Sequence, residues 1–276
     1  GLTDDEARAC LAAPVYLNWQ WMGNLEGTGG PLPKAWIDSH EELGRRIMAR
    51  EQSLGMIPIL HGFSGVVPRI FRTKFPDAHI SRKPAWGRGT FLPTETLDPV
   101  DPLFARVESI YLRQLIQRFG SSHLYMIDPF HESNPPDSSA AYLQSVAKGI
   151  DKTLLEIDPQ AQWVCQDWTL RPDIIKSIPR ERLIIMSLTG GKTASYRDWG
   201  YRYTVGQLNS FGGETHLHGP LVREAANAVS QEMAQSPTCV GSGNWMEGLE
   251  NSPAYYHFML DLNWESAAVE LQRRLD

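Results

Sequence analysis

The sequence lacks the features that mark membrane, nucleic-acid-binding and disulfide-framework proteins. No stretch reaches the roughly 18 uninterrupted apolar residues that a membrane span requires, and Gly1–Glu6 form neither a basic nor an apolar signal-peptide region. The net charge is −6, and the short stretch Arg69–Lys74 is best interpreted as a solvated surface, so a polyanionic partner is disfavoured. Cys10, Cys165 and Cys239 form no CxxC pair, which argues against a zinc site or disulfide framework. Buried free thiols are the favoured interpretation of Cys165 and Cys239, with a single disulfide left open.

Motifs for nucleotides and metals are also missing. No GxGxxG or GxxxxGK[ST] follows an apolar run, so the usual reason for an open nucleotide-binding sheet is absent. The histidines show no HxxxH spacing, and the His216/His218 pair is only a weak metal signal because it follows a glycine turn. The sequence therefore gives no sign of a nucleotide cofactor, and the proposed chemistry does not require a metal.

Short apolar runs alternate with stretches of helical spacing. The predicted strands are Met56–Leu60, Leu124–Ile127, Gln162–Cys165, Leu183–Met186, Tyr203–Leu208 and Cys239–Gly243. The predicted helices are Glu41–Leu54, Pro102–Phe119, Ala140–Ile157 and Val222–Ala234, with Gly120 as a C-terminal cap and Asp137–Ser139 as N-terminal cap candidates. Alternating elements predict an α/β fold with parallel strands. Because polar and aromatic residues gather after the strand ends, a (β/α) TIM-type barrel is favoured over an open sheet, with about six of its eight strands present.

Two glutamates follow predicted strands at positions suited to acid–base chemistry. Glu132 comes after Leu124–Ile127 and just before a rigid Asn-Pro-Pro turn, and Glu247 follows Cys239–Gly243 beside Trp245. A helix cap or an arginine partner is the structural alternative for Glu132, and a surface loop acid is the alternative for Glu247. Two carboxylates at one rim of a barrel suit glycosidic cleavage, in which one protonates the leaving oxygen and the other attacks or activates water.

The tryptophans favour a sugar as the substrate. There are nine in 276 residues, and several fall in the loops after predicted strands. Pyranose rings present apolar C–H faces that pack against aromatic rings. Each tryptophan taken singly is more often a core residue, so the argument depends on their shared position.

Several motifs in one order resemble family 89 glycoside hydrolases, the α-N-acetylglucosaminidases. They are Met22–Glu26 with Gly29–Pro33, Leu54–Leu60 with Gly62–Pro68, Phe130–Pro136, Gln166–Trp168, Asn209–Gly213 and Met246–Pro253. They extend from about Asn18 to Trp264, nearly the whole chain. Each motif is modest alone, whereas six in the same order make a specific resemblance.

The resemblance implies a retaining exo-hydrolase that removes terminal α-linked N-acetylglucosamine, or a related α-linked sugar, from a carbohydrate substrate without a cofactor. Glu132 would be the acid/base and Glu247 the nucleophile. The sugar pocket would be lined by Trp19, Met22, Trp86, His131, Trp168 and Leu208. Family members are secreted, periplasmic or lysosomal, and the chain itself carries no sorting signal.

Three departures from the family pattern qualify that implication. His131 stands where the family has an asparagine that contacts the 2-substituent of the sugar, and Thr28 stands where an aromatic is usual. The first two barrel strands and the flanking domains have no counterpart, so residues 1–276 are expected to form a catalytic barrel domain only. A catalytically inactive carbohydrate-binding relative is the alternative, and an unrelated metal-dependent hydrolase is a weaker one.

Overall fold

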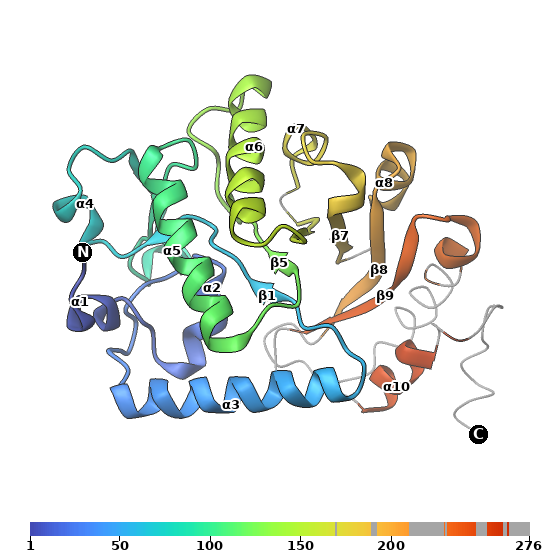
Figure 1. Ribbon diagram of the computed structural model, residues 1–276, viewed down its shortest axis with the longest axis horizontal. Coiled ribbons are helices and arrows are strands. Elements are labelled where there is room, and N and C mark those ends of the chain that lie inside the picture. Colours follow the sequence, from blue (N-terminus) through green and yellow to red (C-terminus); the bar gives the residue numbers. More distant parts are fainter. Residues whose placement is uncertain are drawn as a thin grey trace. The chain divides into compact units, whose positions relative to one another are not determined.

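The computed structural model describes residues 1–168, 170–188, 192–209, 229, 231–246, 253–261 and 264 (Figure 1). The chain divides into two compact units: Gly1–Trp163 with Arg171–Ile178, and Val164–Leu170 with Pro179–Asp276. The described residues form a parallel six-stranded sheet in the order β1 (Leu60–His61), β5 (Leu124–Met126), β6 (Gln162–Gln166), β7 (Leu183–Ser187), β8 (Arg202–Asn209) and β9 (Cys239–Met246). The predicted α/β class and its parallel strands are confirmed.

The first unit contains most of the described helices. They are α1 (Asp4–Ala9), α2 (Leu17–Trp21), α3 (Lys34–Ser53), α4 (Phe71–Lys74), α5 (Pro102–Phe119), α6 (Ala140–Ile157) and α7 (Pro172–Ile175). Short 3-10 turns cover Pro14–Tyr16 and Gly87–Gly89. Figure 1 shows α5 and α6 side by side, as their mutual contacts require.

Helices α5 and α6 have the predicted bounds because local signals at both ends agree with the apolar stripe between them. The Asp101 carboxylate accepts the Leu103 N–H (2.8 Å), and Gly120, with φ of 80°, ends α5. The Ser139 hydroxyl caps α6 by accepting the Tyr142 N–H (3.3 Å). The buried face of α6 has helical spacing and consists of Leu143, Val146, Ala147, Ile150, Thr153 and Leu154.

The predicted strand Met56–Leu60 is wrong except for its last residue. Only Leu60 and His61 pair with β5, opposite Tyr125 and Met126. Pro58 has no N–H to donate to a ladder, and Met56, Ile57 and Ile59 are 56%, 66% and 43% exposed. The preceding helix, α3, begins at Lys34 rather than at Glu41 and ends at Ser53.

A second, antiparallel sheet in the first unit was not predicted. It has the order β2 (Val66–Val67), β4 (Glu95–Leu97) and β3 (Ile80–Arg82). The Glu95 carboxylate in β4 is fully buried between Arg72 (2.5 Å) and Arg82 (2.8 Å). Paired charges of this kind are tolerated inside a protein where single ones are not. Arg72 belongs to the basic stretch Arg69–Lys74, so part of that stretch is structural rather than merely solvated.

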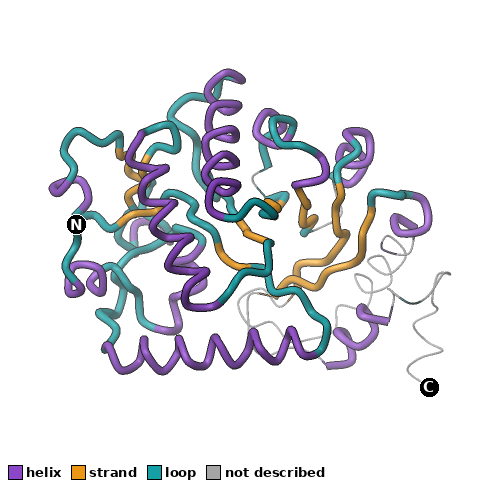
Figure 2. Tube along the Cα trace, in the orientation of Figure 1, coloured by secondary structure: helices purple, strands orange, loops and turns teal. Residues whose placement is uncertain are grey.

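In the second unit, β7, β8 and β9 pair in parallel (Figure 2), with Tyr203 of β8 opposite both Ile185 and Cys239. Strand β7 is buried almost throughout, as the run Leu183–Met186 predicts. Two helices are bounded here, α8 (Thr193–Trp199) and α10 (Pro253–Asp261). Val229 and residues 231–235 are helical, and the rest of the predicted helix Val222–Ala234 lies outside the described residues.

The three cysteines are free thiols, with Cys165 buried and Cys10 and Cys239 half-buried. This confirms the interpretation of Cys165 as a buried free thiol. No helix among the described residues is long and apolar enough to cross a membrane.

Candidate active site

Glu132 lies in a tight turn directly after β5. The His131 N–H donates to the Asp128 carbonyl (3.3 Å), and the Ser133 N–H donates to the Phe130 carbonyl (3.1 Å). Within this turn Glu132 has φ of 47°, in the left-handed region that costs a non-glycine residue about 1–3 kcal/mol. Such strain persists only where the surroundings impose it. It therefore marks Glu132 as a side chain whose direction is set by its neighbours.

The segment after α2 supplies one of those neighbours. The Met22 N–H donates to Asn18 (3.1 Å) and the Asn24 N–H to Trp19 (2.8 Å), so the chain folds back on the helix that it has just left. Asn24 is buried, and its Nδ2 donates to Oε2 of Glu132 over 2.9 Å. An amide donor at this position fixes the carboxyl group without adding a charge.

Lys83 holds the same turn through its backbone. Its Nζ donates to the His131 carbonyl (2.8 Å), while its own N–H extends the β3–β4 ladder by donating to Thr94 (2.9 Å). The Thr94 hydroxyl donates to the Gly23 carbonyl (2.8 Å). A Cβ at Gly23 would lie 3.0 Å from Lys83 Nζ and 2.7 Å from Val66. A larger residue at this position would therefore collide with the Lys83 side chain in its observed place.

Burial changes the proton affinity of two groups in this site. It lowers the pKa of Lys83 to about 8, and the nearby charge of Glu132 offsets this only in part. Burial also lowers the pKa of His131, helped by the positive charge of Lys83 and by His61 and opposed by Glu132. Burial therefore favours the neutral form of His131. Its side chain is 7% exposed, and Nε2 has no hydrogen-bond partner within the described part of the chain.

Aromatic rings lie on the elements that carry these groups. Trp19 of α2 and Trp86 lie 6.1 Å apart between ring centroids, and Trp86 lies 5.6 Å from Phe91. Trp19, Met22 and Trp86 are half-buried. The structure thus brings Trp19 together with Trp86, and Asn24 connects the segment that carries Trp19 and Met22 to Glu132.

The second unit carries the other predicted pocket residues. Trp168 follows β6 and is 49% exposed, and Leu208 of β8 is half-buried. Trp168 follows Asp167, which is buried and accepts hydrogen bonds from the Ser187 hydroxyl (2.8 Å) and the Leu188 N–H (3.0 Å). Asp167 thereby fixes the chain at the end of β6.

The second predicted carboxylate, Glu247, lies outside the described residues, as do His216 and His218. Its strand is described up to Met246. There the Trp245 indole N–H donates to the Ser187 carbonyl of β7 (3.2 Å), which anchors the end of β9.

Sequence reasoning did not identify Asn24 or Lys83 as site residues. Asn24 belongs to the family-like motif Met22–Glu26, but nothing in the motif indicates that it contacts Glu132. Lys83 gives no signal at all, because its burial depends on the antiparallel sheet that was not predicted.

Comparisons with known proteins show which family this chain resembles. Residues 1–266 match the family described as the α-N-acetylglucosaminidase (NAGLU) TIM-barrel domain. Human α-N-acetylglucosaminidase is 30% identical over 288 residues, a match that covers 98% of this chain and 38% of the human protein.

Solved structures of a family 89 glycoside hydrolase from Clostridium perfringens match with a TM-score of 0.89 and 25% identity. They hold 2-acetamido-1,2-dideoxynojirmycin in one case and PUGNAc in another, and the match covers all of this chain and 32% of that one. This chain thus spans well under half the length of these relatives. It belongs to the α-N-acetylglucosaminidase TIM-barrel domain family.

Proposed function

We propose that this chain is the catalytic barrel domain of a retaining exo-glycosidase that removes terminal α-linked N-acetylglucosamine. The observation that carries the proposal is Glu132, which follows β5 in a strained turn and is held by Asn24 and Lys83. A carboxyl group fixed in this way after a barrel strand is suited to proton transfer at one atom of a bound sugar. We propose further that residues 1–276 form one domain and contribute six strands to an eight-stranded barrel.

The assignment of Glu247 as the partner carboxylate is supported by a relative. One structure of the Clostridium perfringens enzyme carries two Glu→Gln substitutions and holds its substrate, GlcNAc-α-1,4-galactose. Those two glutamates are 118 positions apart in that sequence, and Glu132 and Glu247 are 115 apart here. Loss of two carboxylates in a complex with uncleaved substrate is expected for a catalytic pair.

The reaction would proceed by two displacements at the anomeric carbon. In the first, protonated Glu132 gives its proton to the glycosidic oxygen while the Glu247 carboxylate attacks C1; the C1–O bond breaks and a glycosyl ester forms. In the second, ionised Glu132 takes a proton from water, the water oxygen attacks C1, and the ester bond to Glu247 breaks. The free sugar then leaves with its original anomeric configuration, and both carboxyl groups return to their starting states.

The sugar would be held by aromatic faces and one neutral imidazole. Trp19, Trp86 and Trp168 offer ring surfaces, and Met22 and Leu208 add apolar contacts. Neutral His131 has a ring nitrogen without a partner among the described residues, and it would donate to or accept from the 2-substituent. This residue would therefore decide between a 2-acetamido and a 2-hydroxyl group.

Hydrolysis of two aryl glycosides by the intact protein tests the proposal. We expect nitrophenol release from the α-N-acetylglucosaminide, initial formation of the α-anomer by NMR, and full activity in the presence of a chelator. Faster hydrolysis of the plain α-glucoside would remove only the acetamido preference. If the folded protein binds the sugar but releases nitrophenol from neither compound, it is a carbohydrate-binding relative.

A further inference from the structure

We propose that Lys83 is a positioning residue for Glu132: it holds the backbone of the turn that carries the acid/base. The inference depends on the role proposed above for Glu132. It concerns a residue that does not touch the sugar and that acts through the turn.

The first argument is geometric. Glu132 has a left-handed backbone, and the peptide group that precedes it is held through its carbonyl by Lys83 Nζ at 2.8 Å. That peptide connects His131 to Glu132, so a shift in its plane changes the direction of both side chains. Asn24 fixes the carboxyl group of Glu132 by donating to its Oε2 (2.9 Å). Glu132 is thus held at two points, one on the backbone and one on the carboxyl group.

The second argument is the cost of placing an ammonium here. Lys83 is 9% exposed, and its hydrogen-bond acceptor is a neutral carbonyl. Burying a lysine charge in such a place is unfavourable, and methionine would fill a similar volume without the penalty. Gly23 and Thr94 provide the space and the backbone position that the ammonium needs. Several residues thus accommodate a charge that the fold alone does not require.

The third argument is electrostatic. Among the described residues, the titratable groups whose charges act on Lys83 and His131 are Glu132 and His61, besides Lys83 itself. Glu132 is the one anion among them, and its charge raises the pKa of Lys83 against the effect of burial. The charge of Glu132 therefore helps to keep Lys83 an ammonium, the form that donates most strongly to the His131 carbonyl.

The experiment is a double-mutant cycle between Lys83→Met and Glu132→Gln in the intact protein. Two substrates are used: GlcNAc-α-1,4-galactose, which needs a proton on its leaving oxygen, and an aryl glycoside with a strongly activated leaving group, which does not. We expect Lys83→Met to lower kcat/KM for the disaccharide by about 10- to 100-fold. In the Glu132→Gln background the same change should cost less than about 3-fold on the same disaccharide, because Lys83 then has no acid/base to position. On the activated substrate it should cost less than about 3-fold in either background.

The pH profile separates positioning from a merely structural role. Burial lowers the pKa of Lys83 to about 8, so the ammonium is lost as the pH rises through that value, and wild-type kcat/KM should fall there in a limb that Lys83→Met lacks. Lys83→Gln retains a donor for the His131 carbonyl but no charge, so it should also lack this limb, with a smaller loss of rate. If Lys83→Met does not fold, the same measurements on Lys83→Gln test the proposal. Lys152→Met, at an exposed lysine of α6, is the matched control and should change neither quantity.

Two failures are distinguishable. If Glu132→Gln hydrolyses the disaccharide at the wild-type rate, the proposed function of Glu132 is wrong. If Glu132→Gln behaves as an acid/base variant but the folded Lys83 variants keep the wild-type pH limb and leaving-group dependence, only the role of Lys83 is overturned.

Discussion

The two ends of strand β5 each carry a residue with an unusual backbone. Among the described residues, the only non-glycine positions with positive φ are His123, just before the strand, with φ of 63°, and Glu132, after it, with φ of 47°. Both lie in the first unit, and both are held by polar side chains from distant parts of the sequence. The two networks differ in how completely their polar groups are satisfied.

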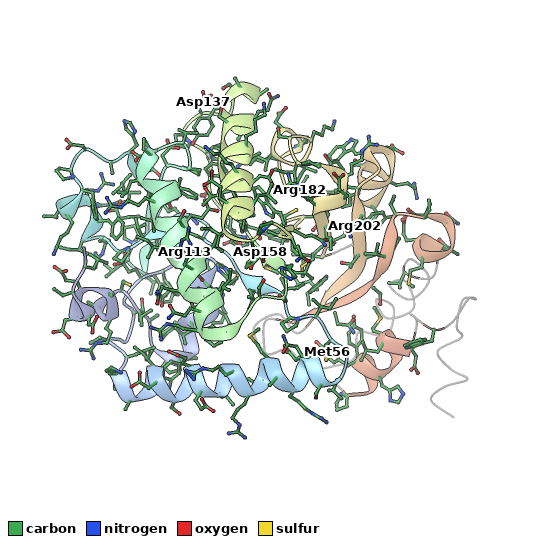
Figure 3. The ribbon with its side chains drawn as sticks, viewed as in Figure 1. Met56, Arg113, Asp137, Asp158, Arg182 and Arg202 are labelled. Atoms are coloured by element: carbon green, nitrogen blue, oxygen red, sulfur yellow. The ribbon has the colours of Figure 1, made fainter. Side chains whose placement is uncertain are left out.

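At the N-terminal end, three side chains converge on one carboxylate. Asp158, just beyond α6, accepts hydrogen bonds from Ser121 (2.7 Å), Tyr125 (2.7 Å) and His123 Nδ1 (2.8 Å). Figure 3 labels it at the end of α6 opposite Asp137. Burial raises the pKa of Asp158, but these three hydrogen bonds and a fourth from the Gln160 N–H outweigh burial, and the net pKa is lowered. This network ties β5 to α6.

At the C-terminal end, the polar groups are not all satisfied within the protein. His131 Nε2 is buried with no partner among the described residues, and a lysine ammonium is buried nearby. Open hydrogen-bonding capacity of this kind suits a site that completes its bonds with a ligand. The difference agrees with the division of labour in (β/α) barrels, in which the C-terminal ends of strands carry chemistry and the N-terminal ends carry stability.

The largest effect is expected from Glu132→Gln. Glutamine keeps an acceptor for Asn24 but cannot transfer a proton, so kcat/KM for the disaccharide should fall by about 10²- to 10⁴-fold. The melting temperature should change little. Steady-state assays with a thermal scan measure both quantities, and Glu156→Gln, an exposed change on α6, is the control. A large loss of stability without loss of activity would reverse the proposed roles of the two ends.

Asp158→Asn should have the opposite pattern. The amide leaves donors from Ser121, Tyr125 and His123 facing a neutral group, which should lower the free energy of unfolding by about 2–4 kcal/mol. At a temperature where the variant is folded, kcat/KM should stay within about 2-fold of wild type. Asp38→Asn, which breaks an exposed ion pair on α3, should change neither value.

A buried acid on α5 contributes a separate pH dependence to stability. Glu108 is fully buried, and burial raises its pKa from 4.5 to about 9, an effect that the neighbouring Thr153 hydroxyl opposes only in part. Between these values the folded state keeps a proton that the unfolded state releases, so stability falls as pH rises through this window. Glu108→Gln removes the titration.

As the pH rises, wild type should lose stability relative to Glu108→Gln. Between pH 6 and pH 7 the difference in the free energy of unfolding should grow by at most about 1.4 kcal/mol, and the difference in melting temperature by about 3–5 °C. Thermal scans at both pH values measure it. A gap that stays constant, or narrows, would show that Glu108 is ionised in the folded protein.

The sequence predicted those elements whose signals are local. Helices α5 and α6 have the predicted bounds because their apolar spacing, caps and flanking residues agree. The antiparallel sheet was missed because its strands have two or three residues each and include Arg82 and Glu95, which show no apolar alternation. The run Met56–Leu60 predicted a strand because composition alone does not show that Pro58 interrupts pairing.

The same distinction applies to the site. The position of Glu132 after a strand is visible in the sequence, because a parallel strand and the loop that follows it are consecutive. The groups that hold Glu132 are not visible. Asn24 is separated from it by 108 positions, and Lys83 is separated from His131 by 48. Contacts at such separations depend on how the sheets fold, and no periodicity in the sequence records them.

The smallest effect is expected from His123→Asn, which tests whether the strained residue before β5 has any role beyond stability. Asparagine tolerates a left-handed backbone better than most residues, and its amide offers a donor for Asp158 in place of the ring nitrogen. The free energy of unfolding should therefore change by less than about 1 kcal/mol, whereas His123→Ala should cost more because it loses the donor and keeps the strain. Neither variant should alter kcat/KM. By contrast, Glu132→Asn places the same residue at the other left-handed position and should abolish proton transfer. A fall in kcat/KM for His123→Asn at unchanged stability would mean that the N-terminal end of β5 is coupled to the chemistry, and the contrast between the two ends would fail.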